Sequence, residues 1–167
     1  MASKSVYLSL GSNLGAREQN LERALAGLER EHIHVLSRSS VYETEPQDFT
    51  QQAWFLNMAV ECDTGCFPLQ LLTVVERIER ELGRVRGGGT IRKGPRIIDI
   101  DILLFGNIVM NTPRLTIPHP RMLERRFMLE PLIEIAPNLK HAGTKQPLSR
   151  YLGNVAAQKV RKLPSGA

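Results

Sequence analysis

Two aspartates interrupt an apolar run in the segment RIIDIDILLF, residues 96–105. Residues two apart on a β-strand point to the same face, so Asp99 and Asp101 share one face and the isoleucines around them share the other. At about 3.3 Å per residue, the two carboxylates are roughly 6–7 Å apart. They repel each other unless a cation lies between them, and hard oxygen ligands favour Mg²⁺. The pair suits metal-dependent phosphoryl transfer, although a solvated strand face would also accommodate it.

Basic side chains flank this run on both sides. The upstream segment RVRGGGTIRKGPR, residues 84–96, places arginines and a lysine around the run GGG. These cations suit a polyphosphate, although a solvated basic loop or a nucleic-acid patch has the same composition. Together with the aspartates, the segment predicts a cationic lid that neutralises a triphosphate opposite the metal. The downstream segment RLTIPHPRMLERRF adds further phosphate-directed groups, namely Arg114, Thr116, His119, Arg121, Arg125 and Arg126.

The elements that position these residues follow from hydrophobic periodicity. It predicts strands at residues 6–10, about 33–43, 54–63 and 96–105, and helices over 18–31 and 68–82. In the third strand, Leu56, Met58 and Val60 share one face with Trp54. The glycine-asparagine pair at 106–107 predicts a tight hairpin into IVM. Two short helices are expected at roughly 121–135, broken before Pro131, and 147–159, ahead of a fraying tail.

This order predicts an α+β fold with a ferredoxin-like βαββαβ core and an added C-terminal hairpin strand and helices. Right-handed crossovers would place both core helices on one face of the sheet. The length of 167 residues predicts a single domain over residues 1–167. The fold order would also suit an RNA-binding module. However, sheets that read RNA carry several exposed aromatics, and only 5% of this chain is aromatic, so we expect no nucleic-acid partner.

Composition limits the cellular compartments and the partners that we expect for this protein. No apolar stretch approaches the length of a membrane span, and the N-terminus lacks the apolar core of a signal peptide, so we expect a cytoplasmic protein without a membrane partner. Cys62 and Cys66 are expected to be reduced thiols. The net charge of +5 suggests anionic ligands. Because no strongly apolar surface element is evident, we expect a monomer.

Six segments carry a resemblance to a known family. The segment KGPRIIDIDILLFG (93–106) resembles the signature of 6-hydroxymethyl-7,8-dihydropterin pyrophosphokinases. Five others match the family in order and spacing: LSLGSNLG (8–15), SSVYETEP (39–46), FLNMAV (55–60), RIERELGRVR (77–86) and RLTIPHPRM (114–122). Each motif alone is weak, but six in the right order are specific, and they cover nearly all of residues 5–135.

The resemblance implies an enzyme of folate biosynthesis that transfers the pyrophosphoryl group of ATP to a hydroxymethyl pterin and releases AMP, with two Mg²⁺ ions. It implies that Asp99 and Asp101 bind the metals. It also implies catalytic arginines at Arg84, Arg92 and Arg96, and ATP contacts from Arg86, Lys93, Arg114, Thr116, His119 and Arg125. The pterin pocket would consist of Thr44, Glu45, Pro46, Phe55, Asn57 and Phe127.

These pterin residues make physical sense. Phe55 and Phe127 can sandwich a flat heterocycle, and Asn57 offers both a donor and an acceptor to its edge. The chain departs from some family members at Lys93, Pro120 and Glu45. A metal-dependent nuclease or nucleotidyl transferase, and a non-catalytic sensor of the same fold, remain as alternatives because the aspartate pair does not distinguish among them.

Overall fold

The computed structural model describes residues 4–47, 51–83 and 96–164. Its core elements are β1 (Lys4–Ser12), α1 (Arg17–Arg30), β2 (His34–Arg38), β3 (Tyr42–Thr44), β4 (Phe55–Thr64), α2 (Pro68–Glu81) and β5 (Asp99–Phe105). They are followed by β6 (Met110–Asn111), β7 (Thr116–Ile117), the 3₁₀ turn η1 (Met122–Glu124), α3 (Arg126–Ile135), the 3₁₀ helix η2 (Leu148–Val155) and β8 (Val160–Lys162).

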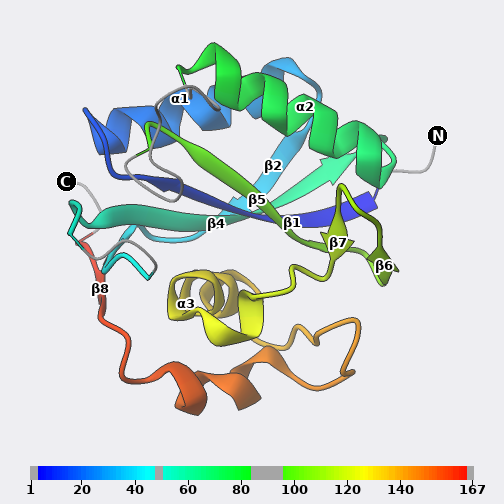
Figure 1. Cartoon of the computed structure of the whole chain (residues 1–167). Helices are drawn as coiled ribbons and strands as arrows, with labels where there is room; N and C mark the ends of the chain where they lie inside the picture. The colour runs from blue at the N-terminus through cyan, green and yellow to red at the C-terminus, as the bar shows by residue number, and fades with distance from the viewer. Residues whose placement is uncertain (1–3, 48–50, 84–95, 165–167) are drawn as a thin grey trace.

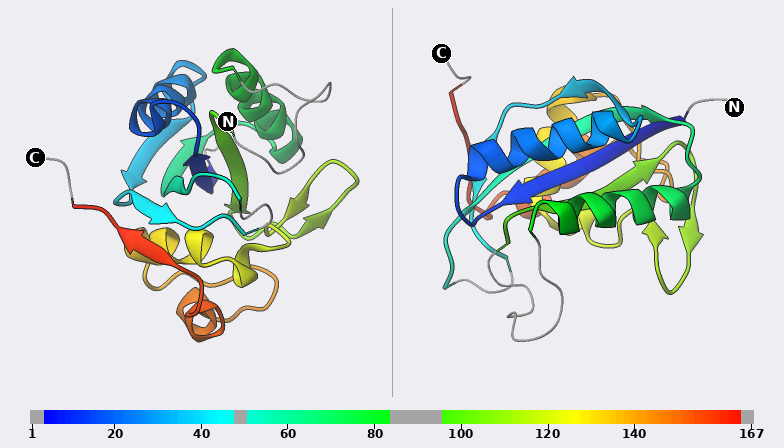
Figure 2. Two further views of the ribbon diagram at one scale, coloured as in Figure 1. Left: turned by 60° about the vertical axis from the view of Figure 1, so that its left-hand side comes forward. Right: turned by 90° about the horizontal axis from the view of Figure 1, so that it is seen from above.

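The main sheet is antiparallel with strand order β5-β1-β4-β3-β8, and β2 pairs with β4 beside β3. Helices α1 and α2 cover one face of the sheet, while α3 covers the other with η2 beneath it (Figures 1 and 2). The predicted ferredoxin-like βαββαβ core, with both crossover helices on one face, is therefore confirmed. No helix of the described ranges is long and apolar enough to cross a membrane.

Two hydrophobic clusters hold these layers together. Under α1 and α2, the alternating residues Leu8, Leu10, Leu56 and Met58 pack on helix residues such as Leu28. On the opposite face, a second cluster joins the sheet to α3 and η2 through Ala59, Leu103, Met128, Leu129, Leu132 and Leu148. The two faces correspond to the two sets of alternate residues predicted for the third strand, because successive strand residues point to opposite sides.

The predicted strand at about 33–43 is in fact two strands, β2 and β3. Between them, the hydroxyl of Ser39 accepts a hydrogen bond of 2.9 Å from the backbone N–H of Ala59. The Ser39 N–H donates to the Ala59 carbonyl, also at 2.9 Å. A side-chain oxygen thus replaces a backbone acceptor, and this local competition interrupts the strand.

The predicted hairpin from β5 into IVM is wrong. A turn does follow Phe105, but β6 pairs with β7 in a separate two-stranded sheet. Of the two turn residues, Gly106 has a positive φ of 54° and Asn107 does not. A tight two-residue hairpin of type I′ needs positive φ at both central positions, so this turn leads the chain away from β5.

The predicted break before Pro131 is also wrong, because Pro131 lies inside α3. An interior proline removes one helical hydrogen bond and costs about 3 kcal/mol. The helix continues because Met128, Leu129 and Leu132 are buried against the sheet, which offsets that cost. Strand β8, which pairs with β3 along the edge of the main sheet, was not predicted from the sequence.

Candidate active site

Strand β1 is the floor of the site, and its neighbours are set by backbone register. Gly11 of β1 lies opposite Asn57 on β4 and opposite Asp99 on β5. Two residues earlier, Ser9 lies opposite Asp101. Directly paired residues of antiparallel strands point to the same face. The two aspartates and Asn57 therefore lie on the α3 face, separated by two small residues of β1.

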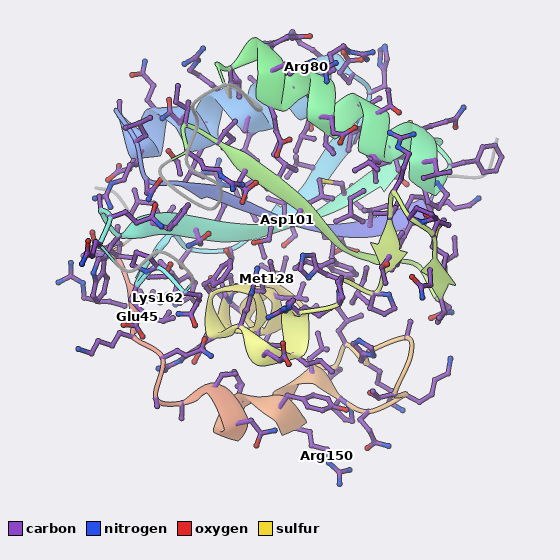
Figure 3. All side chains as sticks on the ribbon, in the orientation of Figure 1. Glu45, Arg80, Asp101, Met128, Arg150 and Lys162 are labelled. Atoms are coloured by element: carbon purple, nitrogen blue, oxygen red, sulfur yellow. The ribbon has the colours of Figure 1, made fainter. Side chains whose placement is uncertain are left out.

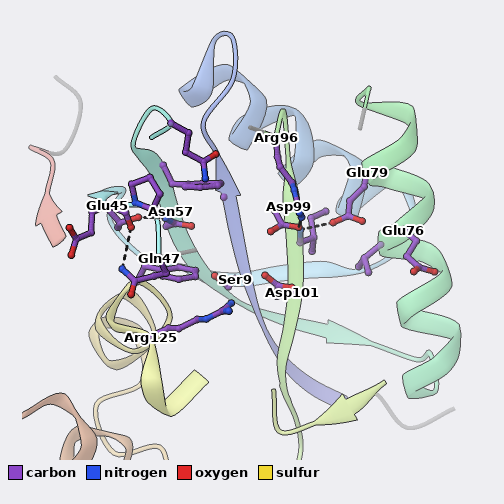
Figure 4. A pocket seen from close by; sticks show the side chains of 18 of the residues that line it. Ser9, Glu45, Gln47, Asn57, Glu76, Glu79, Arg96, Asp99, Asp101 and Arg125 are labelled. Atoms are coloured by element: carbon purple, nitrogen blue, oxygen red, sulfur yellow. Dashed lines mark hydrogen bonds and ion pairs between the residues drawn. The ribbon is translucent and has the colours of Figure 1, made fainter. Parts of the chain in front are cut away.

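A cavity of about 380 Å³ opens over this floor (Figure 4). Its acidic end, at β5 and α2, carries Asp99 and Asp101, while its opposite end lies at β3 and β4, around Asn57 (Figure 4). Figure 3 shows where Asp101 lies on the sheet. The residues that line it are Ser9, Gly11, Thr44, Glu45, Pro46, Gln47, Gln52, Phe55, Asn57, Leu72, Val75, Glu76, Glu79, Arg96, Asp99, Ile100, Asp101, Arg125 and Phe127.

At the acidic end, an arginine and a histidine flank the aspartate pair. The guanidinium Nη1 of Arg96 lies 3.5 Å from Asp99 Oδ1. The ring Nε2 of His119 lies 3.9 Å from Asp101 Oδ1. Burial lowers the pKa of His119 to about 4, helped by the nearby Arg125 and opposed by Asp99. His119 is therefore neutral at pH 7 and contributes hydrogen bonding rather than charge.

The donor set at this end suits Mg²⁺. The described ranges contain no cluster of three or more His, Cys, Asp or Glu side chains arranged to bind a metal ion by themselves. Magnesium, however, is commonly bound by one or two carboxylates together with substrate phosphates, and rarely by an all-protein cage. Asp99 and Asp101, on one strand face and flanked by arginine, supply such a pair.

At the opposite end, a buried amide lies beside two aromatic rings. Asn57 is 3% exposed and donates from Nδ2 to Thr44 Oγ1 at 2.6 Å. Phe55 and Phe127 also line the cavity, and the guanidinium of Arg125 lies 5.8 Å from the centre of the Phe127 ring. A flat apolar heterocycle with polar edges would fit between such rings and an amide.

The cavity brings together all six residues predicted for the pterin pocket, both aspartates, Arg96 and Arg125. Arg114, Thr116 and His119 are not among its lining residues, although His119 lies beside the lining residue Asp101. Arg114 forms an ion pair of 3.4 Å with the lining residue Glu76, and Thr116 donates to Asn111 on β6. Four other predicted residues, Arg84, Arg86, Arg92 and Lys93, lie outside the described residues.

Glu79, a buried carboxylate of α2 that is only 2% exposed, was not among the residues predicted for the site. Its Oε2 accepts a hydrogen bond of 2.8 Å from the backbone N–H of Ile100, between the two aspartates (Figure 4). The available signal was its position on the apolar face of an amphipathic helix. A charged residue at such a position is seldom fully buried without a partner.

Asn13, which connects three segments at the rim of the cavity, was not predicted either. Its backbone N–H donates to the Arg96 carbonyl at 3.0 Å, and its Oδ1 accepts from the Arg96 N–H at 2.7 Å. Its Nδ2 donates to Gln52 Oε1 at 2.7 Å and to the Ala53 carbonyl at 3.0 Å. This side chain therefore orients the backbone that carries the Arg96 guanidinium toward Asp99.

Comparisons with known proteins agree with this geometry. Residues 7–137 match the sequence model of a family described as 7,8-dihydro-6-hydroxymethylpterin-pyrophosphokinase (HPPK). The 2-amino-4-hydroxy-6-hydroxymethyldihydropteridine pyrophosphokinase of Bacillus subtilis is 47% identical over 139 residues, which is 83% of this chain and 81% of that protein.

Other relatives are longer. The folic acid synthesis protein of Schizosaccharomyces pombe is 42% identical over 160 residues, and the match covers 95% of this chain. The chain spans only about a fifth, 21%, of that relative's length. The crystal structure of a Plasmodium falciparum HPPK-DHPS with pterin and p-hydroxybenzoate superposes with a TM-score of 0.72 at 17% identity. The superposition covers 92% of this chain and 42% of the Plasmodium falciparum chain. At 17% identity, this similarity shows a shared fold.

Proposed function

We propose that this chain, which belongs to the family of 7,8-dihydro-6-hydroxymethylpterin-pyrophosphokinases, transfers the pyrophosphoryl group of ATP to 6-hydroxymethyl-7,8-dihydropterin. The products are AMP and the pterin diphosphate, in a step of folate biosynthesis. One observation carries the proposal: a single cavity joins a paired-carboxylate end to an end with a buried amide and two aromatic rings. A substrate hydroxyl held at one end can then meet a triphosphate held at the other.

The acidic end is the phosphate site in this proposal. Asp99 and Asp101 would hold two Mg²⁺ ions together with oxygens of the triphosphate. Bound magnesium would supply charge neutralisation and make the substrate hydroxyl more acidic. Arg96 and Arg125, both lining the cavity, stabilise the negative charge that develops on the transferring group. Neutral His119 hydrogen-bonds the nucleotide, as do Arg114 and Thr116 from the β7 side.

The opposite end orients the pterin. Phe55 and Phe127 hold the two faces of the ring, while Asn57 pairs with its polar edge. Phosphoryl transfer depends mostly on positioning and on charge stabilisation, so fixing the hydroxymethyl group in line with the β-phosphorus supplies much of the rate. Arg84 and Arg92 are assigned to catalysis, and Arg86 and Lys93 to ATP, in the same proposal.

Product analysis tests this function. The protein is incubated with ATP, Mg²⁺ and 6-hydroxymethyl-7,8-dihydropterin, and the nucleotide products are separated. We expect AMP, formed only when the pterin is present. ADP would place the attack on the γ-phosphorus, and no product from a folded, Mg²⁺-supplied protein would refute the proposal.

Substitution of the aspartates provides a second test. Asp101→Ala should lower kcat more than about 100-fold, because the phosphates lose a metal ligand. Asp63→Ala is the matched control, since Asp63 lies on β4 and does not line the cavity. Equal activity of the two variants would contradict the assignment.

The remaining parts of the proposal concern partners and oligomeric state. We propose a cytoplasmic monomer whose partners are ATP and the pterin, without nucleic acid. A titration with single-stranded RNA at low salt should stay flat. Light scattering on a sizing column should give the mass of one chain, 18.8 kDa.

A further inference from the structure

Gly11 occupies the central position of the cavity floor, between Asn57 and Asp99 in the strand register. It lies within β1, and it is not among the described glycines with positive φ. Any residue could therefore adopt its backbone conformation, and the reason for a glycine must lie in the space around it.

The space above Gly11 is filled by the amide of Asn57. A Cβ at position 11 would lie 2.5 Å from Asn57 Oδ1 and 3.5 Å from Cδ1 of Phe55. Real Cβ atoms essentially never come within 3.0 Å of another heavy atom, so an added methyl would displace the amide by about 0.5 Å or more. The carboxamide oxygen thus reaches across β1 into a space that only glycine leaves open.

The amide cannot simply move aside. Its Nδ2 donates to Thr44 Oγ1 at 2.6 Å, and the residue is 3% exposed. A shift of the oxygen away from β1 would rotate or break that buried hydrogen bond. Since β3 holds the nitrogen and β1 leaves room for the oxygen, the orientation of the amide is set from both sides.

We propose that Gly11 is a positioning residue for substrate recognition. By leaving its side-chain space open, it keeps the Asn57 oxygen over β1 as an acceptor for an N–H group on the edge of the bound heterocycle. This inference rests on the proposed function, because it assigns that ring to the pterin. It predicts that the ligand edge at Asn57 must offer a donor, as the amino-pyrimidinone edge of a pterin does.

The variant Gly11→Ala tests the inference by ligand binding. Dissociation constants are measured by titration calorimetry for the pterin, in the presence of Mg²⁺ and a non-hydrolysable ATP analogue, and for the analogue alone. We expect the pterin Kd to rise about 10- to 100-fold, as for one misaligned buried hydrogen bond. The analogue Kd should stay within about twofold. Gly65→Ala is the matched control, since a Cβ there meets nothing within 4 Å.

A double-mutant cycle distinguishes this role from a general packing effect. In an Asn57→Ala background the clashing oxygen is gone, so Gly11→Ala should cause no further loss of pterin affinity or melting temperature. An equal loss in both backgrounds, or a pterin Kd for Gly11→Ala within twofold of the parent protein, would overturn the inference. If Gly11→Ala does not fold, Gly11→Ala/Asn57→Ala should fold like Asn57→Ala, and its failure to fold would also overturn it.

Failure of the proposed function gives a different result. The parent protein would then bind no pterin, while the cycle could still be measured by thermal melting. If Gly11→Ala lowers the melting temperature in the parent protein but not in the Asn57→Ala background, the role of Gly11 in positioning the amide is supported. If the two substitutions lower the melting temperature additively, that role is refuted.

Discussion

Replacement of Glu79 should loosen the strand that carries both aspartates. The Glu79 carboxylate reaches from α2 to the edge strand β5, where its Oε2 accepts a hydrogen bond from the Ile100 N–H at 2.8 Å. With the side chain 2% exposed, water cannot easily replace that acceptor. Glu79→Leu therefore leaves a buried N–H unsatisfied, whereas Glu79→Gln retains an amide oxygen in the same place.

The expected loss follows from the desolvation of that N–H. An unsatisfied buried donor costs about 1–3 kcal/mol. For a protein of this size, each kcal/mol shifts the melting temperature by about 2–4 °C, so Glu79→Leu should melt about 2–12 °C lower. Glu79→Gln should fall by less. Because Ile100 lies between Asp99 and Asp101, Glu79→Leu should also weaken binding of the Mg²⁺-loaded ATP analogue.

Thermal unfolding followed by circular dichroism in EDTA measures the stability effect without metal, and titration calorimetry measures the nucleotide affinity. Glu81→Leu is the control, because Glu81 lies on the same helix with a side chain 54% exposed, where a substitution changes stability by at most about 0.5 kcal/mol. A Glu79→Leu protein that melts with the parent, or a Glu79→Gln protein that loses as much as Glu79→Leu, would refute the reasoning.

Three further predictions concern other parts of the chain. Asn13→Asp keeps an acceptor for the Arg96 N–H, whereas Asn13→Ala removes it. Steady-state kcat should therefore fall further in Asn13→Ala than in Asn13→Asp, and equal values would contradict the role of Asn13 in orienting Arg96. Burial, with nearby acidic groups, raises the pKa of the Cys62 thiol to about 12. A thiol reagent at pH 8 should therefore label the partly exposed Cys66 first, and simultaneous labelling of both cysteines in the folded protein would contradict this prediction. The folded-state pKa of His119, about 4, is below its ordinary value of 6.5, so its contribution to stability is complete above pH 6.5 and is lost as the pH falls toward 4. Urea unfolding of the metal-free protein should show this loss, about 3 kcal/mol, as a pH dependence that His119→Gln lacks.

Much of the architecture follows from local patterns in the chain. The apolar face of α2 follows the helical period, and the two faces of β4 follow the period of a strand. The placement of Asp99 and Asp101 on one face also follows from a local pattern, because it depends only on the alternation of side chains within one strand. The six family motifs are also contiguous stretches of sequence, so the proposed chemistry can be inferred from the chain alone.

Local patterns misled where a distant contact outweighed them. The proline in α3 costs a hydrogen bond, but burial of the helix against the sheet stabilises it. The turn after Phe105 has the composition of a hairpin, yet β6 pairs with β7. Strand β8 has no strong pattern of its own and forms because β3 offers an edge. The predicted roles of Arg84 and Arg92 stay predictions.

Tertiary structure alone decided how these local elements meet. Strand register places Gly11 between Asn57 and Asp99, although these residues come from three segments far apart in the sequence. A shift of one residue in either pairing would turn a strand's side chains to the other face, and no local period encodes which register forms. The reach of Glu79 to the Ile100 backbone depends likewise on how α2 packs on β5. The kinds of groups in the site can be inferred from the separate segments that carry them, but the distances between these groups are set by packing between segments.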